Sequence, residues 1–228
     1  VAESQVVRAA FPGARGAAWL WDPQTGSRAP LATGAPGVLD LYFAPLESKL
    51  IVFDPSGPSA AGTSDAAGSA PAPSGAQIAV HGPWQVELRT GGSGEIATRE
   101  FATLIDLSLS DDPRLRDFGG VLIYRTSVSG PSASGRAWLD LGHVNGTTEV
   151  RLNGESLGVQ WWGRRVYDLG NRLRPGQNTL EVEVTTPLAN QMRAMRDNAM
   201  AQRWAWWAPP IEMGLPGPVE LRVAPAAP

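Results

Sequence analysis

The chain has 228 residues, a formal net charge of −3 and no cysteine. This length allows one large domain or two modest ones, each able to bury a core. The small net charge gives no electrostatic footprint for nucleic acid or an anionic membrane surface, so we expect neither as a partner. The lack of cysteine excludes disulfides and thiolate chemistry and leaves the redox compartment open.

No apolar run approaches the roughly 20 residues that span a bilayer, and no charged and then apolar segment at the N-terminus indicates a signal peptide. The chain begins at Val1 and enters strand-like sequence at once, so we expect a fragment or a processed product. Strands are predicted at 4–11, 17–21, 38–43 and 49–53. Four strands without a covering layer leave one face unburied, so we expect residues 1–53 to be the end of a β-sandwich that docks on neighbouring sequence.

Residues 54–76 are rich in Pro, Gly, Ser and Ala, and they hold almost nothing that could offset the entropy of ordering, so we predict a flexible, partly extended linker. A second domain is predicted over 77–225. Within it, Asp111-Asp112-Pro113 suits a turn into a short helical or irregular piece, and the long apolar run at 119–129 predicts a strand near the centre of a sheet.

The stretch at 136–186 reads as four strands whose apolar residues alternate with polar ones. Asn153-Gly154 predicts a tight hairpin turn, because both residues reach positive φ at low cost. A second turn is predicted at 174–178. We expect the apolar set on one face of an antiparallel sheet and the charged residues on the other. Beyond it, Leu188, Met192, Met195 and Ala199 recur at helical spacing and predict a helical insertion near 188–208 that is ended by Pro209-Pro210, before a closing strand at 219–223.

The run LDLGHVNGTTEVRLNGESLG, an aromatic loop and VYDLGNRLRPGQNTLEVEVT together resemble the galactose-binding-like jelly roll of family 2 and family 106 glycoside hydrolases. GPWQVEL, SDDPRLRDFGGVLIYRTSV and GLPGPVELRV are similar to the C-terminal region of family 106 α-L-rhamnosidases, and LYFAPLESKLIVFD is similar to the strand that closes the preceding sandwich. The resemblance implies an all-β fold: an antiparallel jelly-roll β-sandwich preceded by strands from the end of a second β-sandwich. In that family the catalytic barrel lies N-terminal to this region.

The same resemblance implies a non-catalytic region of a bacterial α-L-rhamnosidase-like glycoside hydrolase, periplasmic or secreted. Its expected partners are the catalytic domain of the same parent enzyme and a rhamnose-containing glycan. Two other functions remain open, an independent carbohydrate-binding module and a purely structural or interdomain interaction domain. An enzyme in its own right would need paired carboxylates in a pocket.

No catalytic set is visible in the sequence. The candidate carboxylate pairs are Asp111 with Asp112 and Glu181 with Glu183, and each is expected to be ordinary surface charge. No cofactor is expected. Jelly rolls of this resemblance often hold a structural calcium, for which Asp111, Asp112 and Asp117 are weak candidates against the alternative of turn and capping aspartates.

Tryptophan gives the best functional signal, since five of the nine fall at 161–162 and 204–207, beside arginines. The C–H face of a sugar packs on indole and its hydroxyls bind polar side chains, but clustered tryptophan and arginine also mark protein interfaces. Carbohydrate contact and interdomain contact therefore both stay open, with core packing as the third alternative. Trp84 and Trp138 are predicted to be core residues. The candidate contact residues are Trp161, Trp162, Arg164, Arg165, Arg203, Trp204, Trp206 and Trp207.

Overall fold

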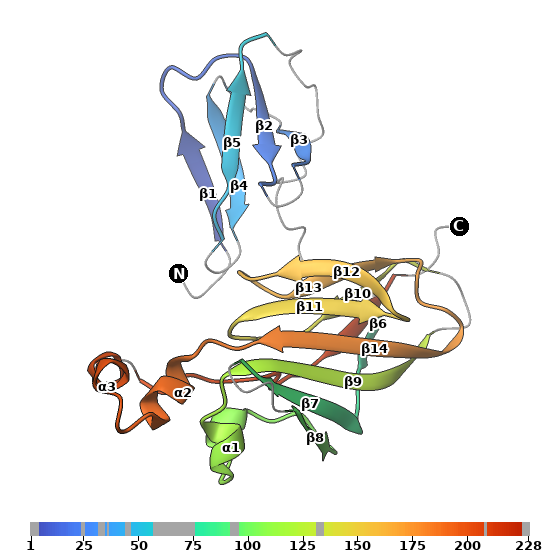
Figure 1. The fold of residues 1–228 in the computed structure, drawn as a ribbon. Coiled ribbons are helices and arrows are strands. Elements are labelled where there is room, and N and C mark those ends of the chain that lie inside the picture. The colour runs from blue at the N-terminus through green and yellow to red at the C-terminus, as the bar shows by residue number, and fades with distance from the viewer. Residues whose placement is uncertain are drawn as a thin grey trace. The chain divides into compact units, whose positions relative to one another are not determined.

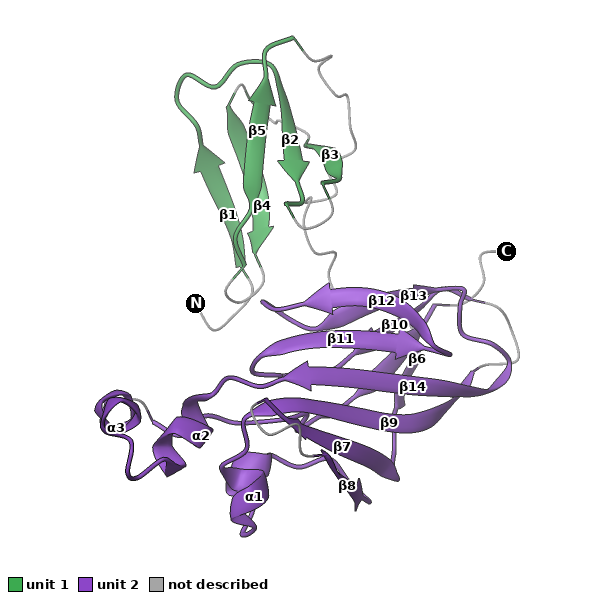
Figure 2. Cartoon of the chain, viewed as in Figure 1, with its two compact units in different colours: residues 1–72 green, residues 73–228 purple. Residues whose placement is uncertain are grey.

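A computed structural model describes residues 5–23, 26–31, 35, 37–43, 47–56, 76–91, 96–130, 135–207 and 209–224. The chain divides into two compact units, residues 1–72 and residues 73–228 (Figure 2). Most of the predicted linker, residues 57–75, lies outside the described residues. Within the described ranges, no helix is both long enough and apolar enough to cross a membrane.

The described part of the smaller unit contains two antiparallel sheets (Figure 1). One pairs β1 with β4, and the other has the strand order β3-β2-β5. The strands are β1 (Gln5–Ala10), β2 (Ala17–Trp21), β3 (Arg28–Leu31), β4 (Val38–Phe43) and β5 (Leu50–Asp54).

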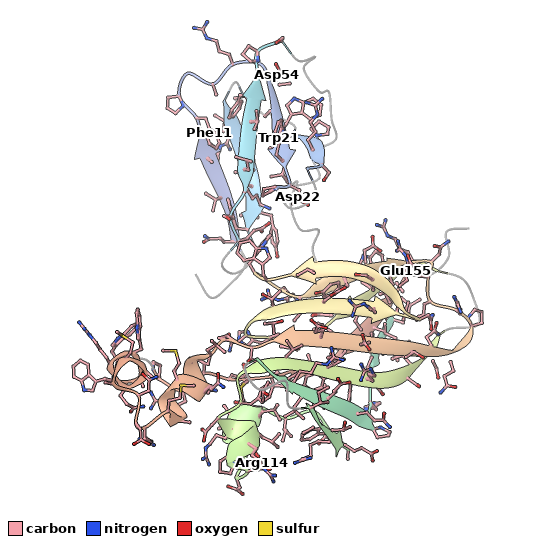
Figure 3. The ribbon with its side chains drawn as sticks, viewed as in Figure 1. Phe11, Trp21, Asp22, Asp54, Arg114 and Glu155 are labelled. Atoms are coloured by element: carbon pink, nitrogen blue, oxygen red, sulfur yellow. The ribbon has the colours of Figure 1, made fainter. Side chains whose placement is uncertain are left out.

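The two sheets of the smaller unit share a small core, so the prediction of strands without a covering layer is wrong. Leu39 and Leu41 of one sheet are buried in the same cluster as Ala18 and Leu31 of the other. The strand that supplies Leu31 was missed, because three of its four residues are exposed and it carries a proline. Phe11, which Figure 3 labels, adds an aromatic contact with Phe53 at 5.3 Å between ring centroids.

The larger unit is a sandwich of two antiparallel sheets (Figure 1). In the described residues one sheet has the order β13-β10-β15-β6 and the other has the order β12-β11-β14-β9-β7-β8. The strands are β6 (Ala76–Ala79), β7 (Trp84–Thr90), β8 (Ile96–Phe101), β9 (Gly120–Gly130), β10 (Ala137–Asp140), β11 (Thr147–Leu152), β12 (Glu155–Gln160), β13 (Val166–Gly170), β14 (Gly176–Thr185) and β15 (Glu220–Val223), and the helices are η1 (Leu107–Leu109), α1 (Pro113–Arg116), α2 (Ala189–Ala194) and α3 (Ala199–Ala205).

One hydrophobic core fills the space between these two sheets. Leu139 of β10 and Leu221 of β15 come from one side, and Val86 of β7, Val150 of β11 and Val182 of β14 come from the other. All five are buried. Alternate residues of each strand point into this layer, as period-2 patterning requires. The predicted all-β sandwich with antiparallel sheets is confirmed.

The stretch at 136–186 does not lie on one sheet, which corrects the prediction. β10 and β13 belong to one sheet, whereas β11, β12 and β14 belong to the other. The apolar residues of both groups face the shared core from opposite sides, so both groups show the same alternation and the pattern cannot separate them. β12 was missed because its residues 155–160 are mostly exposed, as suits a strand at the edge of a sheet.

The predicted hairpin turn at Asn153-Gly154 is confirmed. Asn153 has φ of 53° and Gly154 has φ of 84°, and the turn joins β11 to β12. The buried side chain of Asn178 links this turn to the next one: its Oδ1 accepts from Asn153 Nδ2 at 2.9 Å, and its Nδ2 donates to the carbonyl oxygen of Arg174 at 2.8 Å. Both turns therefore share one buried amide.

Candidate functional site

The two predicted aromatic segments leave the larger unit at the same end of its sandwich. Thr148 is the second residue of β11. It pairs with Gln160 at the end of β12 and with Val184 near the end of β14. Figure 3 shows Glu155 at the start of β12, the other end of that strand. The loop that carries Trp161 and the segment that follows β14 thus start at the same end of the sheet, on either side of β11.

Arg165 joins this loop to the neighbouring one. Its Nη1 donates to the carbonyl oxygen of Gly163 at 2.7 Å, and its Nη2 donates to the carbonyl oxygen of Gly146 at 2.7 Å. Gly146 has φ of 115°, and a Cβ added there would lie 2.3 Å from the carbonyl oxygen of Thr185 at the end of β14. Three connections of the chain therefore meet around one glycine that no larger residue could replace without a shift of the backbone.

The candidate contact residues in the β12–β13 loop have different environments. Trp161 is exposed over 61% of its surface, and Trp162 is half-buried. The guanidinium of Arg164 donates to the carboxylate of Asp140. Arg165 is buried, and burial lowers the pKa of its guanidinium. Trp161 and Arg164 are therefore the exposed candidates of this loop, and Arg164 is paired with Asp140, whereas Arg165 is buried within the structure.

The predicted helical insertion consists of two short helices, α2 and α3, and not of one. Asn198 caps the second helix, because its Oδ1 accepts from the backbone N–H groups of Met200 and Ala201 at 3.1 and 3.0 Å. The apolar spacing across Met195 therefore does not follow a continuous helix. α3 ends at Ala205, before the predicted prolines. Figure 1 shows α2 and α3 beyond the end of the sandwich, after β14.

Polar side chains brace this helical pair, which we call the α2–α3 hairpin (residues 188–207). Arg193 of α2 donates to the carbonyl oxygen of Ala205 of α3 at 2.9 Å. Gln202 Nε2 donates to the carbonyl oxygen of Met195 at 2.9 Å. At the base of the hairpin, buried Asn190 exchanges two hydrogen bonds with the backbone of Ile211, at 2.8 and 3.1 Å. These bracing residues were not predicted, because only their position inside the insertion marked them.

The outer surface of the α2–α3 hairpin is aromatic and apolar. Trp206 is 90% exposed, and the rings of Trp204 and Trp207 lie 5.3 Å apart at 51°. Arg203 precedes these rings and is exposed. An open hollow, lined by residues 194–200, lies at the turn between the helices. The exposed large apolar side chains of the hairpin are Leu188, Met195, Met200, Trp204, Trp206 and Trp207.

Carboxylates and arginines alternate across the outer face of the six-stranded sheet. Partial burial alone would raise the pKa of Glu181, but hydrogen bonds from Arg125 at 2.7 Å and Arg151 at 3.1 Å outweigh it and leave the pKa below its ordinary value. Glu183 is half-buried on the same face. The ladder runs from Arg89 through Glu87, Arg125, Glu181 and Arg151 to Glu149.

The weak metal candidates have other bonds in the structure. Asp112 caps α1 by accepting from the backbone N–H of Arg114 at 3.0 Å, and hydrogen bonds from Arg114 lower its pKa. Asp117 pairs with Arg116 at 3.2 Å, and Asp111 is exposed. Among the described residues, no three His, Cys, Asp or Glu side chains are grouped to hold a metal ion. The structural calcium stays a prediction.

The two tryptophans predicted in the core have different positions. Trp84 is 1% exposed and belongs to the core, as predicted. Trp138 is only partly buried, which corrects the prediction. Its neighbours Ala137 and Leu139 take the inward positions of β10, so Trp138 faces outward, with the guanidinium of Arg136 5.3 Å from the ring centroid.

No protein-family model matches the sequence, and no curated protein matches it. Among solved structures, the chain is similar to a rhamnosidase from Novosphingobium sp. PP1Y, with 29% sequence identity over 96% of this chain and a TM-score of 0.67. The predicted resemblance to rhamnosidases is confirmed. The chain is thus similar to a β-sandwich region associated with a glycoside hydrolase. It spans 22% of the rhamnosidase that it matches.

Several β-glucuronidases also match. The enzyme from Faecalibacterium prausnitzii has 19% identity over 66% of this chain and 32% of its own, with a TM-score of 0.49. The enzyme from Ruminococcus gnavus has 18% identity over 48% of this chain and 21% of its own, with a TM-score of 0.42.

Proposed function

We propose that this chain is a non-catalytic β-sandwich region of a rhamnosidase-like glycoside hydrolase, in which it buttresses the catalytic barrel. The observation that carries the proposal is the match to the Novosphingobium rhamnosidase, which covers 96% of this chain and 22% of that one. A region of this size that accompanies a much longer enzyme suits an accessory role. The acid and the base that cleave the rhamnosyl bond would come from the barrel.

The charge state of the candidate carboxylates supports a non-catalytic role. Glycoside hydrolysis needs one carboxyl group that stays protonated until it donates its proton, and such a group has a raised pKa. Glu181 and Asp112 have lowered pKa values instead, because arginines donate hydrogen bonds to both. Both side chains are therefore ionised near neutral pH and poorly suited to act as the acid.

A hydrolysis assay tests the proposal. The purified chain, offered nitrophenyl α-L-rhamnoside, is expected to release no nitrophenol, whereas a longer protein that joins this chain to its barrel is expected to release it. Glu181→Gln in the longer protein should leave the rate unchanged. Turnover by the purified chain that Glu181→Gln or Asp112→Asn abolishes would show that the region is itself an enzyme.

Support of the barrel is tested by thermal unfolding of the longer protein with and without this region. We expect the barrel to unfold at a lower temperature when the region is removed, because it loses a packed neighbour. An unchanged unfolding temperature would contradict the supporting role. The exposed tryptophans of the α2–α3 hairpin favour a second candidate function, carbohydrate binding, which a titration with rhamnose and galactose would reveal as a saturable change in tryptophan fluorescence.

A further inference from the structure

We propose that the α2–α3 hairpin binds an acidic glycan chain, one whose sugar rings carry carboxylates. This inference rests on the proposed function, since the association with a glycoside hydrolase makes a glycan the appropriate ligand class. It goes further by assigning the ligand to one surface and by giving that ligand a charge.

Hydrogen bonds within the chain brace the hairpin. Gln202 and Arg193 bind backbone carbonyl oxygens across the two helices, and Asn190 fixes the base of the hairpin to Ile211. Ala201, on the inner side of α3, is 3% exposed. The exposed tryptophans therefore lie on a braced segment. Because this surface is preorganised, binding would cost little conformational entropy.

The aromatic rings supply a platform for sugar rings. Trp204 and Trp207 are three residues apart, and the backbone of Trp206 keeps helical dihedral angles, so both rings lie on one side of the helical turn. Together with Trp206 they offer several indole faces within four residues. Such faces pack against the apolar C–H face of a pyranose, and successive sugars of a chain can use successive rings.

Arginines give the platform its preference for acidic sugars. Arg203 and Arg196 are exposed and form no ion pair with any described residue. Arg203 lies four residues before Trp207, a spacing that makes them neighbours on the helical surface. Residues 188–207 contain three arginines and one aspartate, which gives a formal charge of +2 in a chain of net charge −3. A guanidinium binds a carboxylate with two parallel hydrogen bonds, whereas a neutral sugar hydroxyl offers no charge.

A shallow, open hollow lies at the turn between the helices. Its lining includes Arg196, Asp197 and Met195, so it offers a cation, a hydrogen-bond acceptor and an apolar contact.

Calorimetric titration of the full chain with tetragalacturonate tests the inference, and the methyl ester of the same oligosaccharide removes only the charge. We expect saturable binding of the acid and at least about tenfold weaker binding of the ester. Trp206→Ala and Arg203→Gln should each weaken binding of the acid by about tenfold, and Arg203→Lys by less. Trp21→Ala and Arg174→Gln, exposed positions outside the hairpin, serve as matched controls with unchanged affinity.

Three results would overturn the inference. Equal affinity for the acid and the ester would remove the charge preference. Equally tight binding of dextran sulfate, still present in Trp206→Ala, would reduce the effect to unspecific attraction of a polyanion. Absence of binding by a chain with native near-ultraviolet circular dichroism, together with self-association in sedimentation that Trp206→Ala abolishes, would assign the surface to a second copy of the chain. The hydrolysis assay is independent of all three, so failure of the proposed function is recognised separately.

Discussion

Arg165 Nη2 lies 2.7 Å from the carbonyl oxygen of Gly146, and through this bond the loop before β13 is attached to the loop before β11. The guanidinium has no carboxylate partner among the described residues, and its Nε atom is buried without a hydrogen-bond partner there. Burying a cation that only carbonyl oxygens solvate costs free energy. Arg165 therefore has a role that an apolar side chain could not fill, which is to hydrogen-bond both loops.

We expect Arg165→Ala to lower the free energy of unfolding by about 2–4 kcal/mol, because it removes the donor from two partly buried carbonyl oxygens and opens a cavity. Urea denaturation followed by circular dichroism measures this change. Arg174→Ala, an exposed arginine at the other end of β13, is the control and should change the free energy by less than about 0.5 kcal/mol. An equal effect of both substitutions would show that the bond between the loops has no special role.

The charge ladder predicts a loss of stability in acid. Glu181 has a lower pKa in the folded chain than its ordinary value of 4.5. Its contribution is therefore complete above that value and is lost as the pH falls through the lower folded pKa. Glu181→Gln should cost about 1 kcal/mol near neutral pH and should flatten the decline below about pH 4.5. Urea midpoints measured from neutral to acidic pH test this, and parallel curves for both proteins would contradict it.

Asn178 is predicted to be essential for the end of the sandwich that lies away from the hairpin. Its amide binds Arg174 and Gly176 carbonyl oxygens and Asn153 at 2.8, 3.0 and 2.9 Å, and the residue is 1% exposed. Its Oδ1 also accepts from the backbone N–H of Arg174 at 2.9 Å. Asn178→Ala removes all four bonds at once and should cost about 2–4 kcal/mol. Exposed Asn171→Ala serves as the control in the same urea experiment. A loss below about 1 kcal/mol would mean that water replaces the amide.

Asn190 is predicted to hold the base of the α2–α3 hairpin. Asn190→Ala removes both hydrogen bonds to Ile211. We therefore expect the free energy of local opening of the hairpin to fall by more than the free energy of global unfolding. Trypsin cleavage after Arg193 and Arg196 should accelerate by about tenfold, as a loss of about 1.4 kcal/mol implies. Leu188→Ala changes an exposed neighbour and keeps the amide, so its cleavage rate should match that of the wild type. Equal rates for all three proteins would show that the hairpin is held elsewhere.

Local signals in the sequence predicted the hairpin turn at Asn153-Gly154 and the start of α1 correctly. Asn153-Gly154 and Asp112-Pro113 each act within a few residues, and the structure uses them as expected. The division of 136–186 between two sheets could not be predicted, because both sheets face one core and show the same alternation. Trp138 is a different case, because its direction was readable. Its neighbours Ala137 and Leu139 point inward, so the alternation of the strand turns Trp138 outward, whereas it was predicted as a core residue.

At the candidate site, composition located the exposed tryptophans but not the groups that hold them. Asn198 was a readable signal, since asparagine inside a helical pattern favours a cap over an interior position. The burial of Arg165 had no such signal, because it depends on Gly146, nineteen residues earlier, and on the end of β14. Only the folded chain brings these segments together.

The bracing of the α2–α3 hairpin affects how fast a partner could bind and leave. Because Arg193 and Gln202 already hold both helices in place, association would not wait for folding of this segment, and its rate would be set by diffusion and by the field of the exposed arginines. Salt would then slow arrival more than departure. A partner would bind and dissociate quickly on a surface of this kind. Such exchange suits repeated contacts along a polymer chain better than a permanent interface.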